Sequence, residues 1–478
     1  MNPTLIGFII YLIVVLAVGL LTFRLNKTLA DFVLAGRKLG PWIVAFSERA
    51  SGESAWLLIG LPGLALISGY NAIWPAVGCT TGILFSWIFI SRRLRTKSEQ
   101  LGAITIPDFF EARYDDSSRW LRVTATLIIV FFFTFYVAAQ FLAAGKVLNV
   151  TFHITAFWGM VIGACIILFY TIMGGFFAVA WTDFFQGCVM VFTLVLLPVL
   201  GIVLLGGLGS FTEKIASHNP GLLTVGGGQQ GWAMMKTVLG GLAIGLGYMG
   251  QPHLVSRFMA IKKSDSLRQG ALIATVWAIL AYWGAVFIGL VGLALYGVEQ
   301  FADQEQIMPF MATNLLPTWL AGIAISGAIA AMMSTADSQL LVTTSAISED
   351  IYHQMIRKDA PQKKLVRLSR LAAVVVGIVA FILAITAEAL VYDLVLYAWA
   401  GLGASFGPGL LLTLWWRRTT KQGVWAGMVV GMVTVIIWYN FPVLKGTLYE
   451  LIPGFFMALI TVLGVSWVTG NKAIKYNN

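Results

Sequence analysis

Long apolar runs separated by short polar connections extend along the whole chain. Each run is about 20 residues long, the length that an α-helix needs to cross the hydrocarbon core of a bilayer. The ~10-residue alternation typical of a membrane β-barrel does not occur, so the runs predict helices, which satisfy their own backbone hydrogen bonds in lipid. About thirteen runs can be drawn, at 4–23, 42–67, 72–91, 120–147, 154–176, 183–207, 232–256, 271–296, 312–336, 368–387, 389–414, 423–440 and 449–469. The longest connections, at 92–119 and 337–367, are too short for a soluble domain.

Composition supports a polytopic membrane protein and excludes several soluble classes. Hydrophobic residues make up 59% of the 478 residues and charged residues 11%, whereas soluble proteins carry about 25% charged residues. The three cysteines (Cys79, Cys165 and Cys188) lie in apolar runs without the spacing of a disulfide framework or a metal site. No nucleophile–base pair, phosphate-binding loop or metal motif is evident. We therefore expect no enzyme activity, no cofactor and no metal other than a transported ion.

The net charge of +10 raises the question of nucleic-acid binding, and the positions of the basic residues answer it. Lysine and arginine concentrate in alternate connections, at 92–97, 257–268, 357–370, 417–421 and 472–475. All of these fall on the cytoplasmic side if the N-terminus is outside and the C-terminus inside, in agreement with the positive-inside rule. The charge therefore predicts orientation in a bacterial-type inner (plasma) membrane and contact with anionic lipid, not nucleic acid.

Two of the predicted spans are interrupted. The second contains Ser-Glu-Arg-Ala-Ser-Gly-Glu-Ser at 47–54, with three charges, and the seventh has five glycines from Gly240 to Gly250, followed by Pro252. Ionisable groups are costly inside a bilayer and mark function. Interrupted spans in corresponding positions of two halves are typical of inverted-repeat transporters, because freed backbone groups there can bind a cation and the charged ends of an amino acid. The alternative is that the glycines only permit close helix packing.

Polar residues near the ends of other spans add candidates. Ser334 and Thr335, near the end of the ninth span, can supply two oxygen ligands to Na⁺, although hydroxyls in spans more often bond to a carbonyl one turn earlier. Asp183 opens the sixth span, where an ion-pathway residue and an interfacial N-cap are equally good interpretations. Glu349 and Asp350 are interpreted as a solvated helix face.

Seven short motifs distributed over residues 30–460 give the chain a resemblance to a known family. They are VLAGRKLGP (33–41), WLLIGLPG (56–63), FTFY (133–136), GGF (174–176), WTD (181–183), GYMGQPH (247–253) and YAWAG (397–401). With these motifs the chain resembles the sodium/solute symporter family, and most closely its sodium/proline symporters. Each motif alone is weak, but together they are highly specific.

The resemblance implies a fold and an activity. The fold would be of the leucine-transporter type, an all-α single transmembrane domain over 1–478. Five-plus-five inverted repeats would occupy approximately 42–215 and 232–418, with flanking helices at 4–23, 423–440 and 449–469. The activity would be uptake of a small amino acid, with proline preferred, coupled to Na⁺ by alternating access.

The resemblance also implies site residues. The Na⁺ site would be formed by the backbone of Ala50 and Glu53 together with Ala331, Ser334 and Thr335. The substrate would be bordered by Ser54, Ala55, Trp56, Tyr136, Tyr248 and Pro252, with Ile244 at one further pocket position. Asp183 would lie on the cytoplasmic exit route of the ion, and Arg37 would contribute to coupling.

Three departures from the family pattern concern the ion and the substrate. Gly52 stands where proline symporters carry an aspartate important for sodium, and Arg49 and Glu53 occupy positions that are usually small or apolar. As i,i+4 partners on a helix, Arg49 and Glu53 would form an ion pair in which Glu53 replaces the lost aspartate. In the less favoured interpretation, the Arg49 charge stands in for a bound Na⁺ and Glu53 couples H⁺ transport. Ile244 stands where the pocket usually has a tryptophan, which permits a substrate of another shape.

The function predicted from the sequence is therefore a Na⁺-driven symporter for a small amino acid, most closely proline. The first alternative is a proton-coupled symporter of an amino acid or another small solute, in which His253 would be a further candidate for a proton step. An alternative of another class is a membrane sensor built on a transporter-like module. Uptake measured under separate Na⁺ and pH gradients distinguishes these alternatives.

Overall fold

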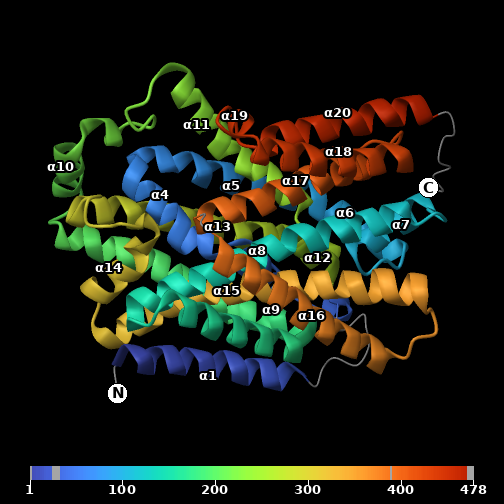
Figure 1. The fold of residues 1–478 in the computed structure, drawn as a ribbon, viewed down its shortest axis with the longest axis horizontal. Coiled ribbons are helices and arrows are strands. Elements are labelled where there is room, and N and C mark those ends of the chain that lie inside the picture. Colours follow the sequence, from blue (N-terminus) through green and yellow to red (C-terminus); the bar gives the residue numbers. More distant parts are fainter. Residues whose placement is uncertain (1–2, 24–32, 388–389, 471–478) are drawn as a thin grey trace.

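Helices that run roughly along the long axis of the view form the body of the molecule (Figure 1). The computed structural model describes residues 3–23, 33–387 and 390–470. Within this part the structure is helical apart from one isolated β-bridge, between Leu39 and Ile261. Helix α1 begins, and helix α20 ends, at opposite ends of the molecule in this view (Figure 1). Each apolar run predicted from the sequence overlaps at least one helix.

The helices of the first half lead from the N-terminal helix to a long helical hairpin. They are α1 (Pro3–Phe23), α3 (Pro41–Gly52), η2 (Trp56–Gly60), α4 (Leu61–Ser68), α5 (Ile73–Phe85), η4 (Ser86–Ser91), α6 (Arg92–Gln100), α7 (Ile106–Tyr114), α8 (Trp120–Phe152), α9 (Ala156–Leu204) and α10 (Leu208–His218). The predicted connection at 92–119 therefore contains two short helices, α6 and α7. Arg93, Arg95 and Lys97 lie on α6, and this polar helix continues directly from η4.

The helices of the second half include the other interrupted span. They are α11 (Gly231–Ala243), η6 (Ile244–Gly250), α12 (Pro252–Ala260), α13 (Leu267–Tyr296), α14 (Ile307–Leu315), α15 (Thr318–Ser345), η9 (Ala346–Ile356), α16 (Gln362–Thr386), α17 (Val391–Trp415), α18 (Lys421–Asn440), α19 (Pro442–Lys445) and α20 (Leu451–Thr469). In the described residues, nine helices are long and apolar enough to cross a membrane, with two shorter apolar helices at Thr4–Val18 and Ala156–Phe169.

Two predicted boundaries are wrong. The ninth span does not end near residue 336, because α15 runs to Ser345 and continues as the π-helix η9 to Ile356. Most of the predicted connection at 337–367 is thus helical. The fifth and sixth predicted spans are two helical segments of α9 that meet directly at a kink at Gly175, whose φ is positive (φ 63°, ψ 174°). The sixth span consequently begins earlier than predicted, and Asp183 lies inside a helix.

Both predicted interruptions are present. After Gly52, α3 ends at Glu53 (φ −103°, ψ 78°), and Ser54 is also non-helical before the chain resumes in the π-helix η2. In the second interruption α11 tightens into the 3-10 helix η6, and Gln251 is extended (φ −84°, ψ 107°). Helix α12 then begins with Pro252, a position where the missing N–H of proline costs no helical hydrogen bond. Backbone polar groups are thus released at two places in the interior.

Glycines bring the second interruption against α5. A Cβ atom on Gly78 would lie 2.4 Å from the carbonyl oxygen of Gly241, and one on Gly82 would lie 2.3 Å from that of Gly245. Only residues without a side chain permit this approach. Close helix packing therefore explains the glycines at these positions. The same segment is also interrupted, so the two explanations of the glycines are both correct.

Candidate functional site

The end of α3 meets α15 at the residues predicted to bind the ion. Ser334 Oγ donates to the carbonyl oxygen of Ala50 at 2.8 Å, and Thr335 Oγ1 donates to that of Ser51 at 3.0 Å. The Ala331 carbonyl oxygen is 3.3 Å from Ser334 Oγ. All of these side chains are buried. The structure thus brings together hydroxyl and carbonyl oxygens, the hard ligands that Na⁺ prefers, around the last turn of an interrupted helix.

A buried charge cluster lies next to this turn. Arg49 Nη1 donates to Glu53 Oε1 at 2.7 Å, which confirms the predicted i,i+4 ion pair. Arg49 also binds both carboxylate oxygens of Glu48, with its Nε 2.6 Å from Oε2, and Trp87 Nε1 donates to the same Oε2 at 3.0 Å. Sequence reasoning counted Glu48 among the charges of the span but gave it no role. The only feature of the sequence that pointed to a role for Glu48 was its position next to Arg49.

Two tyrosine hydroxyls complete the surroundings of Glu53. Tyr248 donates to Glu53 Oε1 at 3.3 Å, Tyr282 donates to Oε2, and the two hydroxyls also contact each other. With Arg49, the carboxylate faces three donors, which suits its ionised, acceptor-only form. Tyr282 was missed because a single tyrosine in the long apolar helix α13 looks like an interfacial anchor.

Aromatic rings enclose the space between the two interruptions. The ring of Trp56 lies 5.7 Å from that of Tyr282, and the ring of Tyr248 lies 4.6 Å from that of Trp399. Trp399 Nε1 donates to the Ile244 carbonyl oxygen at 2.9 Å, so the ring is anchored to η6. The predicted substrate residues Ser54, Ala55, Trp56, Tyr136, Ile244 and Tyr248 are all at most 2% exposed. In this conformation the region is closed to solvent.

The non-helical turn after α3 has its own polar partners. Tyr136 of α8 donates to Ser54 Oγ at 3.4 Å, and the Ala55 amide donates to Gln140 Oε1 at 3.0 Å. Helix α8 therefore supplies groups to the first interruption. Pro252 is buried at the start of α12, where it lines a small cavity that none of these four aromatic residues borders.

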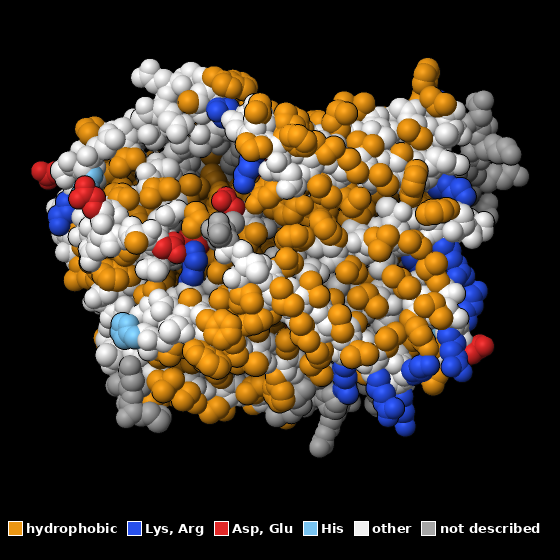
Figure 2. Space-filling model, in the orientation of Figure 1, with side chains coloured by type: hydrophobic (Ala, Val, Ile, Leu, Met, Phe, Trp, Pro, Cys, Tyr) orange, Lys and Arg blue, Asp and Glu red, His pale blue; other side chains and the backbone are white. Residues whose placement is uncertain are grey.

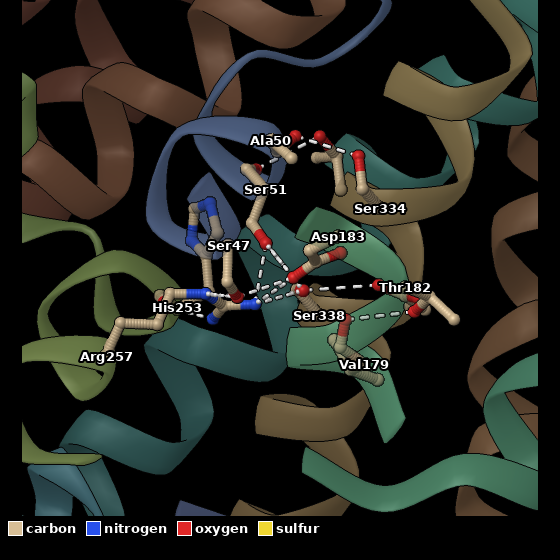
Figure 3. Close-up of polar contacts among 12 residues, drawn as sticks. Ser47, Ala50, Ser51, Val179, Thr182, Asp183, His253, Arg257, Ser334 and Ser338 are labelled. Carbon is tan, nitrogen blue, oxygen red and sulfur yellow. Dashed lines mark hydrogen bonds and ion pairs between the residues drawn. The ribbon is translucent and has the colours of Figure 1, made fainter. Parts of the chain in front are cut away.

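Asp183 is the centre of a second buried network, shown in Figure 3. Its Oδ2 accepts from Ser47 Oγ at 2.7 Å, from Ser51 Oγ at 3.0 Å and from Arg257 Nη2 at 3.2 Å. Arg257 also reaches Ser51 Oγ at 2.6 Å and Ser338 Oγ at 2.5 Å. Ser51 therefore belongs to both sites, because its carbonyl accepts from α15 and its hydroxyl bonds to Asp183.

Two interpretations of the sequence are corrected by this network. The N-cap interpretation of Asp183 is wrong, since the residue lies within α9 and is completely buried. Arg257 is not a loop residue of the basic segment 257–268, because it lies in α12 and is 1% exposed. The burial of Arg257 could have been suspected from the sequence, because the residue follows Pro252 by little more than one helical turn and so lies within reach of the interruption.

Arg37 lies apart from the ion-site residues. Its guanidinium donates to three backbone carbonyls, those of Met259 (2.7 Å), Ala103 (2.6 Å) and Ser98 (3.2 Å). The side chain therefore joins η1 (Ala35–Arg37) to the segment between α6 and α7 and to the end of α12. Any effect of Arg37 on coupling would act through these connections.

The prediction that Glu349 and Asp350 form a solvated face is wrong. Both are buried, in the π-helix η9. Asp350 Oδ1 accepts from Arg122 at 2.6 Å and from Thr105 at 2.9 Å, while Glu349 Oε2 lies 2.8 Å from His353 Nδ1. The error follows from the boundary of α15, because charges in a presumed connection are expected to face water.

Comparison with known proteins identifies the family. The model of the sodium:solute symporter family matches residues 32–431. The sodium/proline symporter of Escherichia coli (strain K12) is 40% identical over 474 residues, which cover 97% of this chain and 92% of that protein. The high-affinity proline transporter of Bacillus subtilis (strain 168) is 41% identical over 460 residues, which cover 95% of this chain and 96% of that protein.

Solved structures support the same architecture. A Na⁺-coupled sialic acid symporter in a substrate-bound outward-open state matches with a TM-score of 0.81 at 19% identity over 98% of each chain. A nucleobase-cation-symport-1 family transporter in a closed conformation matches with a TM-score of 0.57 at 16% identity, over 93% of this chain and 96% of that one. The predicted leucine-transporter-type fold is thereby confirmed, as is the prediction of a transporter rather than an enzyme. The chain belongs to the sodium:solute symporter family.

Proposed function

We propose that the protein is a multi-pass transporter of the bacterial inner membrane that imports proline together with Na⁺. One observation carries the proposal: the hydroxyls of Ser334 and Thr335 meet the carbonyls of Ala50 and Ser51 where α3 is interrupted. These oxygens suit a sodium ion. Relatives about 40% identical over nearly the whole chain are named as proline transporters.

The substrate would lie between the two interruptions. Trp56 and Tyr248 provide aromatic faces for a small apolar ring, and backbone groups freed near Ser54 and Gln251 suit the charged ends of an amino acid. Ile244 leaves more room than a tryptophan would, so slightly larger cyclic amino acids are also substrates in this proposal.

The proposed sequence of events is alternating access. Na⁺ binds first and draws Ala50 of α3 and Ser334 of α15 around it, which orders the turn at Ser54 for the substrate. We propose that the segments 42–215 and 232–418 are the two repeats that move relative to each other. A Na⁺ crossing inward through 100 mV supplies about 2.3 kcal/mol. Tenfold accumulation of a neutral solute costs about 1.4 kcal/mol, so one ion suffices.

The buried charge cluster bears on the choice of ion. Glu53 pairs with Arg49 and lies beside two tyrosine hydroxyls, an arrangement that suits an ionised carboxylate whose charge offsets that of Arg49. This arrangement favours Na⁺ coupling with a structural ion pair. The second candidate function, proton-coupled symport, rests on the pairing of Arg49 with two carboxylates, Glu48 and Glu53, which leaves one carboxylate able to take up a proton.

Uptake of labelled proline into proteoliposomes tests the proposal. We expect an inward Na⁺ gradient to drive accumulation and a pH gradient alone to drive none. Accumulation with the pH gradient in Na⁺-free buffer would establish the proton-coupled candidate instead. Failure to take up proline under either gradient, while another amino acid is accumulated, would contradict the substrate assignment. Empty liposomes are the control for leakage.

A further inference from the structure

A small cavity lies between α7, α12 and the junction of α15 with η9. Its lining includes Thr105, Phe176, Pro252, Ser345 and Asp350. Its volume is about 20 Å³. A single water needs at least about 10–15 Å³ on this measure, so the cavity accepts one water or one small ion and is far too small for an amino acid.

Two residues of the cavity lining each have a polar atom that lacks a partner. Within the described part of the chain, no hydrogen-bond partner reaches Asp350 Oδ2 or Ser345 Oγ, and both atoms are buried. Ser345 is the last residue of α15 and Asp350 lies in η9, whose i→i+5 hydrogen-bonding pattern brings residues five apart onto one side. A buried polar atom without a partner costs about 1–3 kcal/mol, so a ligand is expected where two residues that carry such atoms line one cavity.

The charge around the cavity favours a cation over a neutral ligand. Asp350 Oδ1 already accepts from Arg122, and the same guanidinium binds Asp108 at 2.6 Å and also Glu111. Three carboxylates therefore share one guanidinium, and negative charge is in excess. Of the residues in this cluster, Asp350 is the one that lines the cavity, and one of its two oxygens has no partner.

The position of the cavity relates it to the proposed ion site. Ser345 lies about three turns after Ser334 on the continuous helix α15, and so on the same face. Pro252, which ends the second interruption, also borders the cavity. An ion that leaves Ser334 along this face of α15 would pass Ser338 of the Asp183 network and then meet Ser345 and Asp350.

We propose that Ser345 Oγ and Asp350 Oδ2 bind a second Na⁺ ion, at a station between the central ion site and the end of the molecule that carries the basic residues. The proposal rests on the Na⁺ coupling proposed above. It assigns to Asp350 a role as ion ligand in addition to its ion pair with Arg122. Thr105 keeps the carboxylate oriented by donating to its other oxygen, Oδ1.

Equilibrium binding of ²²Na⁺ to the purified protein tests the proposal without any transport measurement. We expect two Na⁺ per chain in the wild type and one in Ser345→Ala and in Asp350→Asn. The matched control is Ser348→Ala, a buried serine of η9 that accepts from Ser369 at 2.7 Å, and it should keep two. Ser334→Ala with Thr335→Ala should lose the other ion.

Ser345→Ala is the decisive variant. If the hydroxyl only borders a water or an empty space, its removal leaves Na⁺ binding unchanged and leaves thermal stability equal or higher, because an unpaired buried group is gone. That result would overturn the proposal, as would a wild-type stoichiometry of one or zero. A single ion that is lost in the Ser334/Thr335 variant and retained in Ser345→Ala would overturn only the second site. Should Asp350→Asn fail to fold, Ser345→Ala still decides, because it breaks no hydrogen bond of the described structure.

Discussion

At the scale of single residues, the charges of the first interruption form one unit. Arg49 is buried between Glu48 and Glu53, and each carboxylate has a further donor, Trp87 for Glu48 and Tyr282 for Glu53. Removal of Arg49 therefore leaves two carboxylates without compensation, whereas removal of all three charges together leaves none. Replacing Arg49 alone should therefore destabilise the protein more than replacing all three charged residues together.

We expect Arg49→Met to destabilise the protein by about 3–5 kcal/mol, because two buried carboxylates lose their common partner. The triple variant Glu48→Gln, Arg49→Met and Glu53→Gln should recover most of this loss, since no net charge remains buried. Thermal unfolding midpoints of the purified proteins in one detergent measure both effects. An Arg49→Met variant as stable as the wild type would show that Arg49 is not needed to compensate the charges of the two carboxylates.

The hydroxyls of α15 give the residue-level prediction for the ion. Ser334→Ala combined with Thr335→Ala should raise the Na⁺ concentration for half-maximal proline uptake at least tenfold, equivalent to about 1.4 kcal/mol of binding free energy. Thr343→Ala is the matched control, because this buried hydroxyl bonds to Gln339 of its own helix at 2.7 Å. Unchanged Na⁺ dependence in the double variant would disprove the proposed ion ligands.

Sequence reasoning found those residues whose signal was local. Ser334 and Thr335 form a recognisable polar pair in an apolar span, and the spacing of Arg49 and Glu53 predicted their ion pair. Tyr282 and Arg257 were missed or misplaced because their partners are remote in sequence, at Glu53 and Asp183. The sequence pattern contains no information on such pairings before the helices are packed.

At the scale of helices, interruptions were predictable and extensions were not. Glycine, proline and embedded charges marked the breaks after α3 and α11 at nearly the right residues. The extension of α15 into η9 was hidden, because the polar residues that follow Ser345 resemble a connection. Their carboxylates lie inside the protein, where Arg122 pairs with Asp350 and His353 with Glu349, and they do not face water.

The 3-10 segment η6 gives a prediction about the second interruption. A Cβ atom on Gly247 would lie 1.9 Å from Nε1 of Trp399, whose ring is anchored by its bond to Ile244. Gly247→Ala should therefore displace Trp399 or η6, cost roughly 1–3 kcal/mol and reduce proline uptake strongly at normal expression. Gly464→Ala in α20 is the control, since no atom lies within 4 Å of the added Cβ, and it should transport normally. Equal uptake by both variants would contradict the close packing of η6 on α17.

At the scale of the whole molecule, the excess of basic residues has a spatial counterpart. Figure 2 shows Lys and Arg side chains gathered at the end where the C-terminus lies in Figure 1, while most visible Asp and Glu side chains lie at the opposite end. Arg257 is buried in α12 and so does not belong to this basic end, but the uneven distribution of the other charged residues remains. The fold class and the asymmetry were both predictable, because they depend on composition and on the order of segments along the chain.

The asymmetry predicts the orientation of the protein in the membrane, with the basic end in the cytoplasm. In a background where Cys79, Cys165 and Cys188 are replaced by serine, Gln229→Cys places a single exposed thiol in the connection before α11, and Lys363→Cys places one at the start of α16. A membrane-impermeant maleimide should label Gln229→Cys in intact spheroplasts, and Lys363→Cys only after lysis. Both variants should be labelled in lysed cells, which controls for thiol reactivity. The reverse pattern would place the basic end outside, and the proposed inward path along α15 from Ser334 to Asp350 would then run from the cytoplasm outward.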